Sequence, residues 1–145
     1  MPDIKTVGFI GIGNMGRPMS ANLVKGGYTV TLYDLDGKRA REAAVEIGAK
    51  SAATLAELGR LVDAIVTMLP TGKEVRACLL ETEGGALSAN LTKGAIVIDM
   101  SSADPVGTRQ THADLAKRGI AFVDAPVSVA NCCARCGSAS KATTW

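Results

Sequence analysis

Aromatic residues are scarce in this chain: Phe, Tyr and Trp make up 3% of its 145 residues, and His occurs once. A nucleic-acid surface that stacks bases on aromatic rings is therefore disfavoured. Long hydrophobic runs are lacking as well, since the longest, residues 64–69, is far shorter than the ~20 residues of a membrane span. The N-terminus shows no charged segment followed by an apolar one, so we expect no secretory signal, no membrane partner and a cytoplasmic location.

Net charge is nearly absent from most of the chain. Lys and Arg number 16, against 14 Asp and Glu. Residues 129–145 contain Arg135 and Lys141 and no acidic residue, so the preceding residues balance 14 basic against 14 acidic side chains. This neutral body lacks the basic face typical of nucleic-acid-binding proteins. With 47% hydrophobic and 21% charged residues, the composition is that of one ordinary globular domain.

The cysteines are unevenly placed. Cys78 stands alone, whereas Cys132, Cys133 and Cys136 crowd the end of the chain, which is unlike the disulfide framework of a small secreted domain. The Cys133-x-x-Cys136 pair resembles half of a zinc site, but a structural zinc needs four ligands. Because the single histidine, His112, is expected on the solvent side of a helix, we predict no metal site. We expect Cys78 to be a small buried apolar residue.

Apolar runs alternate with helical patterns along the first 128 residues. The strands are expected at 4–10, 28–33, 64–69, 95–100 and 120–123. The helices are expected from 15 to the glycine pair 26–27, at 36–47, from a capping box at 54–57, and at 71–80, 87–91 and 104–117. Strands that are apolar throughout are typical of a parallel sheet covered by helices on both faces. The fold class is therefore α/β, with a Rossmann-type doubly wound sheet in a single domain.

The strongest motif is a G-x-G-x-x-G turn formed by Gly11, Gly13 and Gly16 between the first strand and the first helix. In this context it predicts a dinucleotide-binding site. The first glycine permits the tight turn, the second lets the backbone approach a pyrophosphate, and the third lets the helix pack on the sheet. A turn without a ligand is the alternative. The candidate cofactor contacts here are Gly11, Ile12, Gly13, Asn14, Met15 and Gly16.

An acidic residue, Asp34, ends the second strand 18 residues beyond Gly16. A carboxylate there can accept hydrogen bonds from the adenosine ribose and would repel a 2′-phosphate, so NAD is favoured over NADP. Lys38 and Arg39 follow closely and could weaken that preference, which leaves NADP possible. The alternative is that Asp34 only caps the turn before Asp36.

Four segments in order resemble the β-hydroxyacid dehydrogenase family, which includes 3-hydroxyisobutyrate dehydrogenase, tartronate semialdehyde reductase and, more distantly, 6-phosphogluconate dehydrogenase. They are residues 8–23, 67–71, 98–105 and 124–128. The resemblance covers residues 4–128, the predicted NAD(P)-binding Rossmann domain. It implies an oxidoreductase that transfers hydride between a nicotinamide cofactor and a small 3-hydroxy acid.

The resemblance also implies roles for residues at the carboxyl ends of the later strands. Met68, Leu69 and Pro70 would lie beside the cofactor, and Ser102 would stand near its nicotinamide. Ser128 matches the family's substrate-binding serine. Ligands of parallel sheets bind at these strand ends, although loop capping by a hydroxyl is the alternative for both serines.

The sequence departs from the family after Ser128, where the family continues with Gly-Gly and an all-helical domain that carries its catalytic lysine. Residues 129–145 show no helical or strand periodicity, and we expect a divergent, disordered tail produced by a frameshift or truncation. Lys141 matches no family motif, so no catalytic residue is assigned. We expect this chain to bind cofactor with little turnover and to self-associate through the apolar face that the missing helical domain leaves exposed. A non-enzymatic dinucleotide-binding or interaction module is the alternative.

Overall fold

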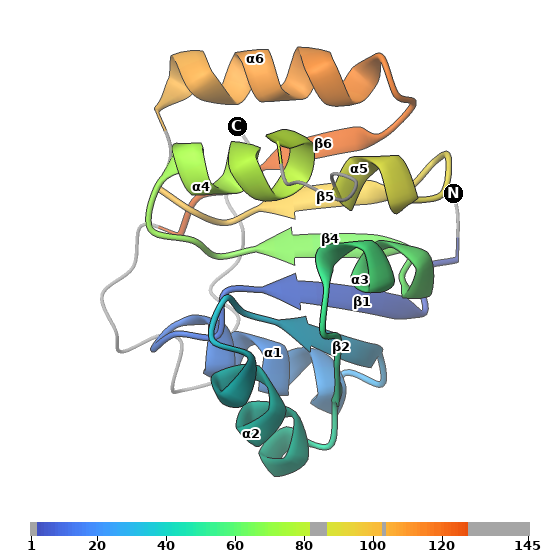
Figure 1. Cartoon of the computed structure of the whole chain (residues 1–145), viewed down its shortest axis with the longest axis vertical. Helices are drawn as coiled ribbons and strands as arrows, with labels where there is room; N and C mark the ends of the chain where they lie inside the picture. Colours follow the sequence, from blue (N-terminus) through green and yellow to red (C-terminus); the bar gives the residue numbers. More distant parts are fainter. Residues whose placement is uncertain (1–2, 82–86, 103, 128–145) are drawn as a thin grey trace.

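The computed structural model describes residues 3–81, 87–102 and 104–127, which form one parallel sheet flanked by helices (Figure 1). The strands are β1 (Thr6–Ile10), β2 (Thr29–Tyr33), β3 (Lys50–Ser51), β4 (Ala64–Thr67), β5 (Ile96–Asp99) and β6 (Ala121–Asp124). The helices are α1 (Gly16–Lys25), α2 (Gly37–Ile47), α3 (Leu55–Leu61), α4 (Gly72–Arg76), α5 (Leu87–Asn90) and α6 (Pro105–Ala116), with a π-helical turn at Ala77–Glu81. Among the described residues, no helix is long and apolar enough to cross a membrane.

The six strands lie in the order β3-β2-β1-β4-β5-β6, and every pair is parallel. All arrowheads in Figure 1 therefore point to the same edge. Strands β2 and β3 are added in order on one side of β1, and β4, β5 and β6 are then added in order on its other side. In register, Ile10 at the end of β1 faces both Tyr33 of β2 and Thr67 of β4. This reversal is the place where doubly wound sheets bind ligands, and the Rossmann-type prediction is confirmed.

Two hydrophobic clusters cover the two faces of the sheet, because successive side chains of a strand point to opposite sides. Along β1, Phe9 and Ile10 are both 1% exposed but belong to different clusters. Phe9 packs with residues of β2 and of helices α1 and α2, and Ile10 packs with residues of α3, α4, α5 and α6. Burial on both faces explains why the strands read as continuous apolar runs.

Local signals set several helix ends as expected. Asp36 begins α2 by accepting hydrogen bonds from the amides of Lys38 and Arg39, and Gly48 ends it in the left-handed conformation at φ 75°. The proposed capping box at α3 is only half correct. Thr54 accepts from the Glu57 amide, but the Glu57 carboxylate accepts from the amide of residue 53 rather than from that of residue 54.

Two elements differ from the sequence-based prediction. The helix expected at 71–80 is divided into α4 and the π-helical turn, and α4 begins with a full capping box between Thr71 and Glu74. The short strand Lys50–Ser51 was not predicted, because two residues are too few to show a period. The expected tail lies outside the described residues.

Candidate functional site

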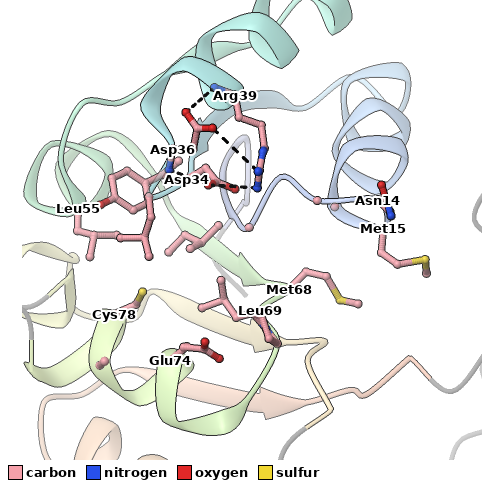
Figure 2. A pocket seen from close by; sticks show the side chains of 18 residues that line it. Asn14, Met15, Asp34, Asp36, Arg39, Leu55, Met68, Leu69, Glu74 and Cys78 are labelled. Carbon is pink, nitrogen blue, oxygen red and sulfur yellow. Dashed lines mark hydrogen bonds and ion pairs between the residues drawn. The ribbon is translucent and has the colours of Figure 1, made fainter.

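A cavity of about 750 Å³ opens at the carboxyl edge of the sheet, where β1 lies between β2 and β4. Figure 2 shows two walls facing each other across it: Asp34, Asp36 and Arg39 on one side, and Leu69, Glu74 and Cys78 on the other. The lining residues are Ile10, Gly11, Gly13, Asn14, Met15, Gly16, Tyr33, Asp34, Leu35, Asp36, Arg39, Leu55, Met68, Leu69, Pro70, Glu74, Ala77 and Cys78. The cavity thus lies at the switch point of the sheet.

The glycine turn forms one side of this cavity, and its three glycines differ in what surrounds them. Gly11 has φ 97°, and a Cβ there would collide with the carbonyl oxygen of Met68. A Cβ on Gly16 would collide with the carbonyl oxygen of Gly11. A Cβ on Gly13 would meet no protein atom within 4 Å. The fold therefore requires the first and third glycines, whereas the second keeps open space in the cavity.

The start of helix α1 has no side-chain cap and no acidic residue in its first turn. Its N-cap residue is Met15, whose side chain makes no capping hydrogen bond. The positive dipole end of this ten-residue helix therefore lies at the cavity with no acidic residue in the first turn of the helix itself. This arrangement fits a bound phosphate group.

Asp34 connects the second strand to the glycine turn. Its Oδ2 accepts a hydrogen bond from the Ile12 amide at 2.8 Å, and its Oδ1 accepts one from the Asp36 amide at 2.9 Å. A guanidinium nitrogen of Arg39 lies 3.8 Å from the same Oδ1. Asp34 therefore caps the turn before Asp36, as the alternative interpretation expected, and it also lines the cavity.

The remaining wall is apolar and includes residues that sequence reasoning missed. Leu35 projects from the end of β2 and is 88% exposed, while Leu55 comes from α3 and Cys78 from the π-helical turn. Cys78 is half-buried on this wall rather than fully buried in the core. Burial, with a smaller effect of the nearby Glu74 carboxylate, raises the pKa of the Cys78 thiol. An apolar wall of this kind suits an aromatic base.

The predicted strand-end residues divide into three groups. Met68, Leu69 and Pro70 line the cavity. Ser102 is exposed and is not among the lining residues. Ser128 lies outside the described residues, as do Lys141 and the three cysteines of the final segment. Ile12 contributes its amide to Asp34 but does not line the cavity.

For some of the cavity residues that the sequence analysis did not predict, the sequence contained a pattern that could have indicated them. Glu74 and Cys78 are four residues apart, so both lie on the same side of α4 and the turn that follows it. Leu55 carried none, because it reaches the cavity only through the packing of α3 on the sheet. Within residues 3–81, 87–102 and 104–127, no group of His, Cys, Asp and Glu side chains could hold a metal ion. His112 is exposed and packs edge-on against Phe122.

Comparison with known proteins agrees with this geometry. Residues 6–141 match the family described as the NAD binding domain of 6-phosphogluconate dehydrogenase. The match continues past residue 128, and the expected domain boundary at that position stays a prediction.

Two curated proteins and one solved structure are similar to most of this chain and contain a further part that it does not cover. The NAD-dependent L-serine dehydrogenase of Pseudomonas aeruginosa is 36% identical over 125 residues, which are 86% of this chain and 41% of the relative. The mitochondrial 3-hydroxyisobutyrate dehydrogenase of Bos taurus is 36% identical over 132 residues, 91% of this chain and 38% of the relative. The structure of Mycobacterium tuberculosis 3-hydroxyisobutyrate dehydrogenase with L-serine is 34% identical, with a TM-score of 0.79 over 88% of this chain and 42% of that one.

The chain thus spans about 40% of the length of these relatives. The resemblance inferred from four short segments is confirmed, and so is a nicotinamide dinucleotide as the class of cofactor. By its matched residues and its fold, the chain belongs to the family of NAD-binding domains found in 6-phosphogluconate dehydrogenase, and its relatives are of the 3-hydroxyisobutyrate dehydrogenase type.

Proposed function

We propose that residues 3–127 bind NAD(P) in the cavity at the switch point, with the pyrophosphate on the glycine turn. The observation that carries this proposal is the open space at Gly13, where the protein itself gives no reason for a glycine. The uncapped start of α1 supports it, because its amides and dipole favour an anion at the same place. Asp34 would then accept hydrogen bonds from the adenosine ribose, and the apolar wall would hold the adenine.

We further propose that the chain serves an oxidoreductase that acts on a short hydroxy acid. The support is the identity of the relatives, two of which are 3-hydroxyisobutyrate dehydrogenases and one an L-serine dehydrogenase. The bound nicotinamide would supply the hydride chemistry, and this chain's residues would orient it and exclude water. Ser102 near the nicotinamide and Ser128 at the substrate remain proposed contacts.

Titration calorimetry of the whole chain with NAD+ tests the binding proposal. Gly13→Ala should abolish or strongly weaken binding, because the added Cβ occupies space that the pyrophosphate needs. Gly107→Ala is the matched control, since a Cβ at that helical glycine has only one atom near it, at 3.9 Å. Normal NAD+ binding by Gly13→Ala, or none by the unchanged chain, would contradict the proposal.

The activity of the chain by itself is a separate question. We propose that none of its lysines takes the family's catalytic position, and therefore that the chain binds the cofactor with little or no turnover of 3-hydroxyisobutyrate. This outcome would favour the non-enzymatic module for the chain as given. Turnover at a rate comparable to that of a full-length relative would exclude it.

Self-association is a further part of the proposal. The edge strand β6 presents Val123 with 48% of its surface exposed, beside the exposed Ala121 on the same side of the strand. Two copies that pack these exposed side chains of β6 against each other would bury them from water. Light scattering over a concentration series should show a dimer, and a Val123→Lys variant should stay monomeric. A cytoplasmic location remains a prediction from the sequence.

A further inference from the structure

Three polar side chains lie buried at the carboxyl edge of the sheet, behind the part of the cavity wall formed by Met68 and Leu69. The exposed fractions are 0% for Thr67, 1% for Asp99 and 0% for Ser101. Buried polar groups, and a buried carboxylate above all, are tolerated only when they are hydrogen-bonded. Their partners therefore show what the cluster holds in place.

The cluster is a continuous chain of hydrogen bonds. The Thr67 hydroxyl donates to Oδ1 of Asp99 at 2.9 Å, and the Ser101 amide donates to the same oxygen at 2.9 Å. The Ser101 hydroxyl oxygen in turn accepts a hydrogen bond from the Leu69 amide at 2.8 Å. Asp99 thus fixes the turn after β5, and Ser101 connects that turn to the segment after β4.

This connection continues the pairing of the sheet just past the end of β4. The Met68 amide donates to the carbonyl of Ile10 in β1 at 2.9 Å, and the Leu69 amide, which faces the opposite neighbour as the next amide along a central strand does, donates to the Ser101 hydroxyl oxygen. The segment is therefore held by β1 on one side and by the turn after β5 on the other. Both Met68 and Leu69 line the cavity, so the position of this wall depends on Ser101.

We propose that Ser101 is a positioning residue for dinucleotide binding, which holds Leu69 in the cavity wall, and that Asp99 orients Ser101 for this task. The inference rests on the proposed function, because it concerns the same cavity. It assigns different tasks to adjacent serines: Ser102, which is exposed, stays the proposed contact, and Ser101 acts only through Leu69. Substitution of a serine that only joined two loops would lower the stability of the fold without a specific effect on the affinity for the cofactor.

Amide hydrogen exchange tests the structural half of the proposal in the absence of any ligand. In Ser101→Ala, the Leu69 amide should lose its protection, while the Met68 amide, which bonds to Ile10, should keep it. Ser101→Cys keeps the shape of the side chain and offers a weaker acceptor, so its Leu69 amide should exchange at an intermediate rate. The Cys variant also serves if the Ala variant fails to fold. Unchanged protection of Leu69 in both variants would overturn the proposal.

Fluorescence titration with NADH tests the functional half on the whole chain. Ser101→Ala should bind NADH about tenfold more weakly, as expected when one hydrogen bond that holds the wall is lost. Ser88→Ala is the matched control, because Ser88 is also buried, accepts a hydrogen bond from Arg118 and does not line the cavity. Its affinity should stay within about twofold of that of the unchanged chain.

A double-mutant cycle with Leu69→Ala separates positioning from general destabilisation. If Ser101 acts through Leu69, Ser101→Ala should weaken NADH binding little further once the Leu69 side chain is gone. Fully additive losses, or an equal loss in Ser88→Ala, would overturn the inference while leaving the proposed function intact. Absence of NADH binding by the unchanged chain would overturn the proposed function itself.

Discussion

The backbone amide of Ile12, inside the glycine turn, donates a hydrogen bond to Oδ2 of Asp34 at 2.8 Å. The two residues are far apart in sequence, and the bond joins the turn after β1 to the end of β2. The carboxylate that is expected to bind the ribose therefore also fixes the loop that is expected to bind the pyrophosphate. Loss of its side chain should affect both halves of a dinucleotide.

Substitutions of Asp34 separate these two tasks. Asp34→Ala removes the acceptor for Ile12 as well as the charge, and should weaken NAD+ binding about 10- to 100-fold, the range expected for a lost hydrogen bond to a charged group. Asp34→Asn keeps an acceptor for Ile12 and should lose less. Calorimetry with NAD+ gives both affinities. Equal losses in the two variants would mean that the bond to Ile12 contributes nothing to binding.

Arg39 should decide how well the site accepts a 2′-phosphate. Its guanidinium lies 3.8 Å from Asp34 and 4.0 Å from Asp36, and it is 53% exposed, so these ion pairs are weak and it can turn to a ligand. Arg39→Ala should weaken binding of 2′,5′-ADP about tenfold and leave AMP, which lacks the 2′-phosphate, nearly unchanged.

The matched control for this comparison is Arg41→Ala, since Arg41 is exposed on the same helix but does not line the cavity. It should alter neither ligand. Equal weakening of AMP and 2′,5′-ADP by Arg39→Ala would show that Arg39 acts by supporting Asp34 and not by contacting a phosphate.

The sequence predicted the parts of the site that depend on local spacing. The glycine turn and Asp34 were found because each lies where a strand ends, and a parallel sheet brings those ends to one edge. The adjacent pair Ser101 and Ser102 shows where this reasoning stops. Both are serines after the same strand, and only the folded structure, in which Ser101 is buried and accepts a hydrogen bond from the Leu69 amide while Ser102 is exposed, shows which one turns inward.

Residues brought to the cavity by helix packing were beyond such reasoning. Leu55 reaches it because α3 packs on β1 and β2, a contact that no short-range pattern encodes. Cys78 reaches it where α4 changes to a π-helical turn, which rotates the following side chains relative to a regular helix. Its apolar character predicted a buried residue, whereas the structure leaves it half-buried on the cavity wall, and only its four-residue spacing from Glu74 indicated a shared side.

Alkylation of Cys78 should report cofactor binding and follow the pKa of its thiol. Burial raises that pKa above its ordinary value of 9.0, so the reactive thiolate is scarcer at neutral pH than for a free cysteine. The rate with iodoacetamide should therefore still be rising above about pH 9, and saturating NAD+ should slow it. Mass spectrometry of the Cys78 peptide distinguishes it from the other cysteines.

The unfolded chain provides the control for this experiment. In urea, Cys78 should react at the rate of an ordinary thiol and NAD+ should offer no protection. A folded-state rate that levels off below about pH 9 would contradict the raised pKa of the thiol, and a rate that is indifferent to NAD+ would contradict the placement of this side chain on the cavity wall.

Asp63 should stabilise the fold in a pH-dependent way without any part in binding. Its Oδ2 accepts three hydrogen bonds, from the Lys5 amide, the Thr6 amide and the Thr6 hydroxyl. The bonds from Thr6, then that from the Lys5 amide, lower the pKa of the Asp63 carboxyl below its ordinary value of 3.8. The stabilisation is therefore complete above that ordinary value and is lost as the pH falls through the lower, folded-state value.

The variant Asp63→Asn tests this assignment by urea unfolding. Its free energy of unfolding should fall below that of the unchanged chain at pH 7, and the difference should shrink as the pH is lowered below the ordinary carboxyl pKa of 3.8, because the folded-state carboxylate is then progressively protonated. Glu42→Gln, which removes an exposed ion pair with Lys38, should show almost no gap at either pH. Because Asp63 precedes β4, at the opposite edge of the sheet from the cavity, the NAD+ affinity of Asp63→Asn at pH 7 should equal that of the unchanged chain. A parallel loss of affinity would show that the two edges of the sheet are coupled.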